Sequence, residues 1–189
     1  MIKLNKGINL IYGESATGKT TLAMQKSLEF SDKGKVFFID TENGFSTERI
    51  KKMRGDYKSL LKNILLFSPK SFIEQHEIIK GLNNIKNSLI ILDTLGCYYR
   101  LELKNNSFVT NKRIEKQLRI LKELSKDNGI LILNQVYQLN DKIEMCGSNL
   151  VRKDCDFIYK LEKNPRKIII EKPERKELNF KIDDSGFVF

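Results

Sequence analysis

The stretch Gly13-Glu14-Ser15-Ala16-Thr17-Gly18-Lys19-Thr20 matches the pattern G-x-x-x-x-G-K-[ST] at every fixed position. This pattern is typical of a phosphate-binding loop, in which glycines let backbone N–H groups approach the phosphates of a nucleotide. Lys19 then neutralises the β- and γ-phosphates, and the hydroxyl of Thr20 offers a ligand to Mg²⁺. We therefore expect this stretch, together with Thr21, to bind a nucleoside triphosphate.

The residues on either side of the loop supply the context that a phosphate-binding loop needs. The apolar run at residues 8–12 predicts a buried strand before the loop. Residues 21–30 place apolar side chains at helical spacing, which predicts a helix after the loop. Because a strand, this loop and a helix follow one another, a chance match to the pattern is disfavoured.

Composition limits the class of protein. The 189 residues suffice for one domain with a sizeable core, and we expect a single domain over residues 1–189. The net charge of +10 favours a polyanionic partner, although a general richness in Lys, Ile and Asn also produces such a charge. Charge therefore supports a nucleic-acid partner but does not establish one.

The cysteines and the absence of targeting segments indicate the compartment. Cys97, Cys146 and Cys155 are odd in number and lack the paired spacing of zinc or redox motifs, so we expect free thiols in a reducing cytoplasm. Neither a signal peptide nor an apolar run long enough to cross a bilayer is present in the sequence. We expect a soluble, cytoplasmic protein without membrane partners.

Further apolar runs that end in polar side chains predict the remaining strands of a parallel sheet. The runs between them have helical periodicity, and alternating strands and helices form a doubly wound α/β fold. The carboxyl ends of parallel strands meet at one edge, beside the phosphate loop. Short strand-like runs at 157–161, 167–171 and 177–182 predict an antiparallel tail. The central runs and their polar ends are 36–39 with Asp40 and Glu42, 89–92 with Asp93, and 130–133 with Asn134 and Gln135.

The polar side chains at these strand ends are candidates for chemistry on the phosphates. Glu42 is placed to polarise an attacking water, with capping of the next turn as the alternative. Asp93 can hold Mg²⁺ opposite Thr20. Asp40 stays open between holding its own loop and holding a magnesium-bound water. His76, among polar neighbours in a predicted helix over 71–84, is expected to be solvent-exposed and without a catalytic role.

Several motifs of this chain follow one another in the order in which the RecA-like recombinases have them. The chain therefore resembles these recombinases and, among them, the archaeal RadB family. The resemblance implies a RecA-like P-loop NTPase core, with a mainly parallel sheet flanked by helices and an antiparallel carboxyl-terminal extension. It implies ATP and Mg²⁺ as cofactors, weak ATP hydrolysis, and a role in homologous recombination and DNA repair. The motifs are residues 13–21, Phe38-Ile39-Asp40-Thr41-Glu42, Phe45-Ser46-Thr47-Glu48-Arg49-Ile50, Leu92-Asp93-Thr94, Leu133-Asn134-Gln135-Val136-Tyr137 and Glu171-Lys172-Pro173.

The resemblance also implies a role for individual residues. Glu42 corresponds to the glutamate that polarises the attacking water, and Lys19 to the lysine that contacts the phosphates. Gln135 corresponds to the glutamine that senses the γ-phosphate, a task that suits a neutral amide. Arg49 corresponds to an arginine that stacks on adenine, although a plain solvated arginine is the alternative.

In this family DNA is bound by two loops, which correspond here to residues 96–110 and 137–149. The first holds Tyr98, Tyr99, Arg100 and Lys104, a mixture of rings and cations that suits base stacking and phosphate pairing. Burial of both tyrosines against a neighbouring helix is the alternative. The second holds Lys142 but also two acidic residues, Asp141 and Glu144, and this near-neutral charge disfavours autonomous strand exchange.

Assembly and partners follow from the predicted start of the core. The first predicted strand begins at Ile8, so we expect no amino-terminal domain and no linker that could join subunits into long filaments. This favours an accessory protein that binds DNA, preferably single-stranded, and assists a RadA-type recombinase. Two alternatives remain: a nucleotide switch that grips a partner without hydrolysis, and a small-molecule kinase, which would need an arginine-rich lid.

Overall fold

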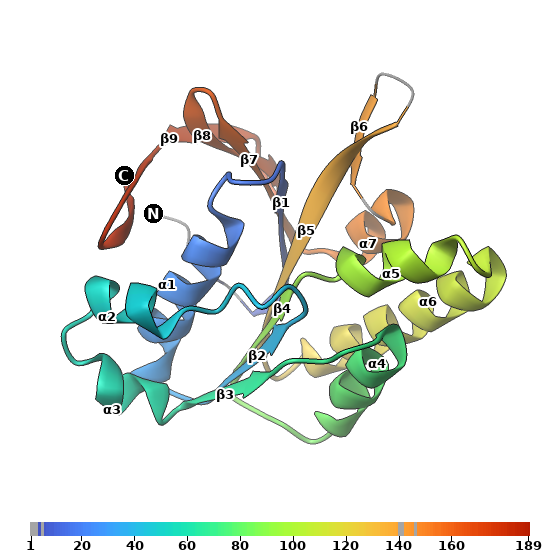
Figure 1. Ribbon diagram of the computed structural model, residues 1–189, viewed down its shortest axis with the longest axis horizontal. Helices are drawn as coiled ribbons and strands as arrows, with labels where there is room; N and C mark the ends of the chain where they lie inside the picture. The colour runs from blue at the N-terminus through green and yellow to red at the C-terminus, as the bar shows by residue number, and fades with distance from the viewer. Residues whose placement is uncertain (1–3, 5, 140–141, 146) are drawn as a thin grey trace.

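The computed structural model describes residue 4 and residues 6–139, 142–145 and 147–189. A sheet forms its centre, with the strand order β3-β2-β4-β5-β1-β7-β8-β9 and with β6 paired to β5 (Figure 1). The strands are β1 (Gly7–Gly13), β2 (Val36–Asp40), β3 (Ile64–Phe67), β4 (Leu89–Asp93), β5 (Gly129–Leu139), β6 (Lys142–Met145), β7 (Phe157–Lys163), β8 (Arg166–Lys172) and β9 (Lys176–Asn179).

Parallel pairing brings the predicted strand ends to one edge of the sheet. β1 pairs in parallel with β5 and β7, and β4 pairs in parallel with β2 and β5. In this register Asp40 lies opposite Asp93, and Gly13 lies opposite Gln135. The prediction of a mainly parallel α/β sheet is confirmed.

Helices cover both faces of the sheet (Figure 1). Polar side chains cap several helix starts: Ser46 accepts a hydrogen bond from Arg49 N at 3.3 Å, and Ser71 accepts one from Glu74 N at 3.1 Å. Such caps satisfy amide groups that have no partner within the helix. The helices are α1 (Lys19–Ser31), α2 (Thr47–Met53), α3 (Tyr57–Leu61), α4 (Phe72–Gly81), α5 (Gly96–Leu103), α6 (Ser107–Leu124) and α7 (Ser148–Asp154).

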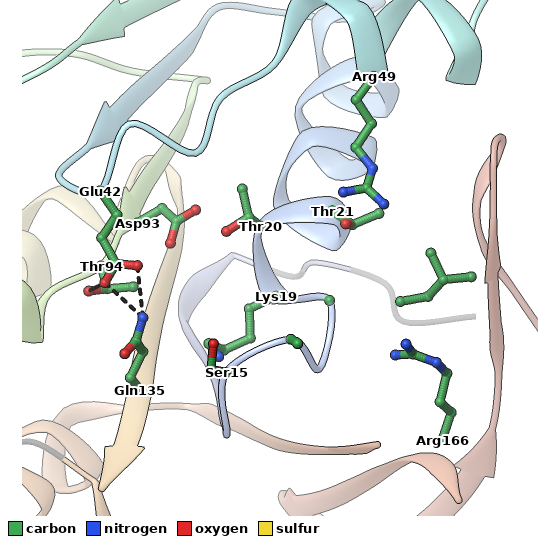
Figure 2. Close-up of a pocket in the computed structure, with 13 residues that line it drawn as sticks. Ser15, Lys19, Thr20, Thr21, Glu42, Arg49, Asp93, Thr94, Gln135 and Arg166 are labelled. Carbon is green, nitrogen blue, oxygen red and sulfur yellow. Dashed lines mark hydrogen bonds between the residues drawn. The ribbon is translucent and has the colours of Figure 1, made fainter. Parts of the chain in front are cut away.

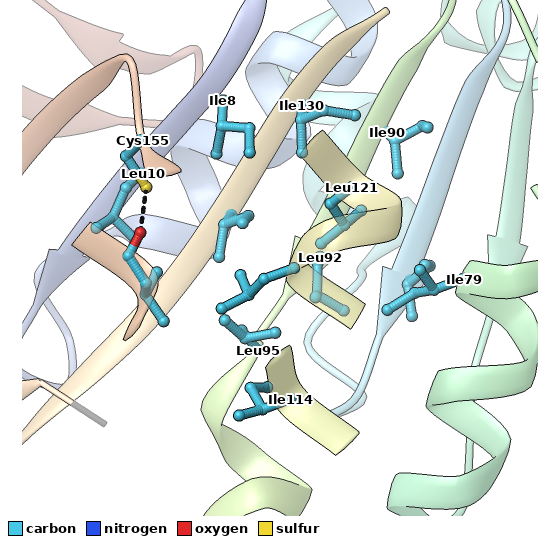
Figure 3. Packing of buried hydrophobic residues seen from close by; sticks show 14 of the residues in the cluster. Ile8, Leu10, Ile79, Ile90, Leu92, Leu95, Ile114, Leu121, Ile130 and Cys155 are labelled. Carbon is cyan, nitrogen blue, oxygen red and sulfur yellow. Dashed lines mark hydrogen bonds between the residues drawn. The ribbon is translucent and has the colours of Figure 1, made fainter. Parts of the chain in front are cut away.

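Two hydrophobic clusters hold these layers together. One contains apolar side chains of α4 to α7 and the sheet face beneath them, including Leu92, Ile114 and Leu121 (Figure 3). The other joins α1, α2 and α3 to the opposite face of the sheet. Successive side chains of a strand point to opposite faces, so each central strand contributes to both clusters. Buried on both sides, these strands need the continuous apolar runs seen in the sequence.

The carboxyl-terminal strands extend the sheet and then return to the phosphate loop. The antiparallel extension is confirmed, because β8 pairs antiparallel with both β7 and β9; β7 also pairs in parallel with β1 and so joins the extension to the parallel sheet. The crossover through α7 carries the chain back across the sheet, so β7 starts at the same edge as β1. A separate hairpin, β10 (Lys181–Asp183) and β11 (Gly186–Val188), packs on α1, where Phe187 N donates to Gln25 Oε1 at 2.8 Å.

Three further expectations concern single residues and membrane spans. His76 is half-buried rather than solvent-exposed, because it lies on the side of α4 near Arg113 and Lys116; burial lowers its pKa. Cys97 and Cys155 are free thiols, and Cys146 lies outside the described residues. Among the helices that the structure describes, none has the length and apolar composition to cross a membrane.

Candidate nucleotide-binding site

The phosphate loop connects β1 to α1, and its two fixed glycines are required by packing as well as by ligand approach. A Cβ atom at Gly13 would lie 2.4 Å from the carbonyl oxygen of Leu161. Gly18 has a φ of +100°, and a Cβ atom there would lie 2.4 Å from Cδ1 of Ile182. Segments from the carboxyl-terminal part of the chain therefore pack closely against both glycines of the loop.

The side chain of Lys19 lies within the curve of the loop. Its Nζ donates hydrogen bonds to the carbonyl oxygens of Gly13 at 2.9 Å and Glu14 at 2.7 Å. Burial lowers the pKa of Lys19, while the carboxylates of Asp93, Glu42 and Glu14 act in the opposite direction. The backbone carbonyl groups of the phosphate loop thus orient the ammonium group of Lys19.

A cavity of about 490 Å³ lies over the loop, a size that suits a small-molecule ligand. It collects most of the predicted site residues from distant parts of the sequence (Figure 2). Thr94, Arg166 and Ile182 also line it, although no role was predicted for them. The lining residues are Ser15, Ala16, Gly18, Lys19, Thr20, Thr21, Glu42, Arg49, Asp93, Thr94, Gln135, Arg166 and Ile182.

Three predicted loop residues do not line this cavity. Gly13 lies at the end of β1, beneath the loop. The carboxylate of Glu14 faces away and pairs with Lys163 at 2.9 Å. Thr17 is buried, and its hydroxyl donates to the carbonyl oxygen of Glu14 at 2.9 Å. These residues shape the loop rather than its ligand-facing surface.

The side chains of Asp93 and Thr20 point toward each other, and both line the cavity (Figure 2). Asp93 is 1% exposed, and its Oδ2 has no hydrogen-bond partner among the described residues. Burial, together with the Glu42 and Asp40 carboxylates, raises the pKa of Asp93 to about 7, against a hydrogen bond from Thr20 and the charge of Lys19. A buried carboxylate oxygen without a donor, beside a hydroxyl, fits a Mg²⁺ site.

The carboxylate of Glu42 is held by the side chain that follows β4 and by Gln135 in β5, a strand that continues to Leu139 instead of ending at Gln135 as predicted. Gln135 Nε2 donates to Glu42 Oε1 at 2.9 Å and to Oε2 at 2.8 Å, and Thr94 Oγ1 donates to Oε1 at 3.0 Å (Figure 2). Thr94 is itself fixed, because its backbone N–H donates to Thr41 Oγ1 at 2.8 Å. The predicted base and the predicted γ-phosphate sensor are therefore in direct contact.

Asp40 is occupied by the backbone of its own loop. Its carboxylate accepts hydrogen bonds from the N–H groups of Glu42 at 3.2 Å, Gly44 at 3.0 Å and Phe45 at 2.9 Å. Of the two interpretations left open from the sequence, loop positioning is the one observed. Asp40 thereby fixes the backbone from which Glu42 projects.

Arg49 and Arg166 lie at the end of the cavity away from Glu42 (Figure 2), and Ile182 lines the cavity beside Gly18. Arg49 is exposed on the first turn of α2, and Arg166 begins β8. Nothing in the local sequence pattern marks Arg166 or Ile182, because the pairing of the carboxyl-terminal strands alone brings them to the loop.

A parallel sheet with a phosphate loop after β1, a carboxylate after β2, and a glutamine in β5 where its parallel pairing with β1 ends defines a RecA-like P-loop nucleotide-binding protein. The family model described as Rad51 matches residues 4–154. The DNA repair and recombination protein RadB of Methanococcus maripaludis is 39% identical over 195 residues, which cover 96% of this chain and 90% of that protein. The chain therefore belongs to the Rad51 family, among its RadB members.

Two further comparisons agree with this assignment. The DNA repair and recombination protein RadB of Thermococcus sibiricus is 38% identical over 202 residues, which cover 97% of this chain and 87% of that protein. The crystal structure of a RadB recombinase superposes with a TM-score of 0.78 at 27% identity, over 96% of this chain and 90% of that one. The relationship thus extends over nearly the whole chain.

The segment 96–110, expected to be a DNA-binding loop, is mostly helical, forming α5 and the start of α6. Tyr99 is 6% exposed, its ring packs edge-on against Phe72, and its hydroxyl donates to Asn111 Oδ1 at 2.6 Å. Tyr98 is half-buried and donates to the carbonyl oxygen of Pro69 at 2.7 Å. The burial that was left open as the alternative is therefore observed, because these rings anchor α5.

Other side chains of α5, α6 and the turn between them are exposed, and we refer to them together as the α5–α6 surface: Arg100, Lys104, Phe108 and Lys112. Phe108 is 70% exposed, with Lys112 Nζ 5.6 Å from its ring centre. Arg100 also lines a small cleft with Glu42 and Gln135. This surface keeps the combination of cations and a ring that the sequence predicted for DNA contact, with Phe108 as the exposed ring.

The second predicted DNA segment is described only in part. Lys142 begins β6, which pairs antiparallel with β5 beyond Gln135. Asp141 lies outside the described residues, and so do the side chains of Lys142 and Glu144. A role for Lys142 in DNA binding therefore stays a prediction.

Proposed function

We propose that this protein is an ATP- and DNA-binding protein of DNA repair and homologous recombination that hydrolyses ATP slowly with Mg²⁺. The observation that carries the proposal is the carboxylate of Glu42, fixed by Gln135 and Thr94 at one end of the cavity over the phosphate loop. Membership among the RadB proteins supports the recombination role. A full recombinase of the RadA type is the proposed protein partner.

We assign a step to each side chain. The loop amides and Lys19 bind the phosphates, and Arg49 stacks on the adenine. Thr20 and Asp93 would hold Mg²⁺, which supplies positive charge to the phosphates when bound. Glu42 orients a water and accepts its proton as the water attacks the γ-phosphate. The side-chain amide of Gln135 stops donating to an oxygen of Glu42 and donates to a phosphate oxygen instead. The resulting change in the position of Gln135 is transmitted along β5.

Replacing Lys19 by alanine tests whether the cavity binds ATP. We expect the affinity for ATP to fall about 10- to 100-fold, because a charge-assisted contact to phosphate is lost. The measurement is ATP titration together with steady-state ATPase assays with and without single-stranded DNA. Lys163→Ala is the matched control, since this lysine pairs with Glu14 outside the cavity. Equal affinity in wild type and Lys19→Ala would contradict the assignment.

DNA binding is proposed for the α5–α6 surface, and Arg100→Ala tests it. We expect weaker binding of single-stranded DNA at low salt and a slope of log K against log salt reduced by about 0.7, because one phosphate contact is removed. The control is Lys33→Ala, which removes an exposed charge just after α1, before the start of β2. Identical salt slopes for wild type and Arg100→Ala would exclude this contact.

A nucleotide switch without hydrolysis is the second candidate function. The hydrogen bonds from Gln135 to both oxygens of Glu42 favour it. A phosphate that takes Gln135 as its donor separates this pair, whether or not the nucleotide is then hydrolysed. Arg100 lines the same small cleft as Gln135, so such a rearrangement lies next to the α5–α6 surface. The turnover of the Glu42 variant separates the two candidates.

A further inference from the structure

Arg166 approaches the phosphate loop from the hairpin between β7 and β8. Its Nη1 donates to the carbonyl oxygen of Thr17 at 3.4 Å, and its side chain is partly buried. The backbone of the residue is held in turn, because Phe180 N donates to its carbonyl oxygen at 3.2 Å. The guanidinium therefore lines the cavity from a fixed position, on the side opposite α2 (Figure 2).

The carboxylates of Glu14 in the phosphate loop and Glu162 in β7 pair with lysines and not with Arg166. Nearby carboxylates are taken by lysines: Glu14 pairs with Lys163 at 2.9 Å, and Glu162 pairs with Lys160 at 2.7 Å and Lys167 at 3.4 Å. Within the described ranges, Arg166 forms no ion pair of its own. A guanidinium that is oriented, partly desolvated and without an acidic partner is suited to binding phosphate or sugar oxygens.

The two ends of the cavity would receive different parts of a nucleotide. Glu42 and Gln135 occupy the end where the terminal phosphate must lie if Glu42 orients the attacking water. Arg166 lies at the other end with Arg49, and Lys19 and Thr20 lie between the two ends (Figure 2). A ligand bound along the loop would thus present its α-phosphate and sugar to Arg166.

We propose that Arg166 binds the α-phosphate and sugar of the nucleotide within the same chain. The inference rests on the proposed nucleotide site and adds to it a residue far from the phosphate loop in sequence. Because the contact avoids the terminal phosphate, it stabilises the ground state and the transition state equally. Arg166 is accordingly a binding residue that affects KM and leaves kcat unchanged.

The test is the affinity of Arg166→Gln for ADP and for ATP, measured by calorimetric titration. Both affinities are expected to fall by the same factor, about 10- to 100-fold, since one charge-assisted contact is lost from each complex. Arg166→Lys, which keeps the charge but not the fork of donors, is expected to fall between wild type and Arg166→Gln. In ATPase assays the KM should rise by a similar factor with kcat unchanged.

Lys167→Gln is the matched control, because it removes the same charge from the next residue, whose ammonium pairs with Glu162 and Glu177. Its affinities should stay within about twofold of wild type. Thermal unfolding of the nucleotide-free proteins separates ligand binding from loop bracing: Arg166→Gln should keep the wild-type midpoint and lose most of the shift produced by ADP.

Three results would overturn the inference. Unchanged ADP affinity in Arg166→Gln would exclude the contact, and a loss restricted to ATP would place Arg166 at the terminal phosphate instead. A lowered unfolding midpoint with an undiminished ADP shift would make Arg166 a brace for Thr17. If wild type itself bound no ADP, the proposed function would fail first, which the titration shows before any variant is compared.

Discussion

Replacing Glu42 by glutamine is expected to lower the rate of ATP hydrolysis about 100- to 10,000-fold, while ATP affinity stays within about threefold of wild type. Glutamine keeps the shape of the side chain, so its oxygen can still accept from Gln135 Nε2 and its amide can donate to Thr94 Oγ1. What it loses is the ability to accept a proton from the attacking water. The readout is single-turnover hydrolysis alongside equilibrium ATP binding.

Glu77→Gln is the matched control, because the substitution makes the same change of charge at a glutamate that pairs with Lys80 on the surface of α4. Turnover by Glu42→Gln at a third or more of the wild-type rate would remove Glu42 from the role of base. If the wild type hydrolysed no ATP even with Mg²⁺, single-stranded DNA and a recombinase partner, the switch without hydrolysis would be the function that remains.

Replacing Asp93 by asparagine is expected to stabilise the protein at pH 8 by about 2 to 4 kcal/mol without nucleotide or Mg²⁺. The pKa of Asp93 is raised from 3.8 to about 7, so the folded state retains a proton that the unfolded state has released. The stability that this proton provides is present below pH 4 and is lost as pH rises toward 7. Asparagine is neutral throughout and avoids the loss, so its advantage grows between pH 5 and pH 8.

Urea unfolding at pH 5 and pH 8 measures this difference in the free energy of unfolding. Asp127→Asn serves as the control, because Asp127 is half-exposed and pairs at the surface with Lys86. A gain from Asp93→Asn that is the same at both pH values would contradict the raised pKa. A gain that grows with pH would show that the ionised carboxylate of Asp93 destabilises the fold when no ligand is bound.

The strand ends were predictable from the sequence because the physics behind them is local. A continuous apolar run marks a strand buried on both faces, and parallel pairing then places the polar residues after each run at one edge. This argument suffices to bring Glu42, Asp93 and Gln135 beside the phosphate loop, and the structure places all three around one cavity.

Features that depend on distant packing could not be predicted in this way. Tyr99 is aromatic and comes soon after a predicted strand end, and the sequence alone left base stacking and burial equally open. Its contact with Phe72 on α4 decides for burial, and that contact depends on how α4 and α5 meet. Arg166 and Ile182 reach the loop through strand pairings that no local periodicity encodes.

The packing of Ile182 against Gly18 has a consequence for how the protein folds during its synthesis on the ribosome. The phosphate loop is synthesised early, but β1 has its neighbour β7, and Gly18 its contact with β10, only after most of the chain has been translated. A domain generally folds as a unit, even though its chain emerges from the amino terminus onward. A nascent chain therefore carries the complete phosphate loop long before it has the later residues that line the nucleotide-binding cavity, so we expect ATP to bind only after most of the chain has been synthesised.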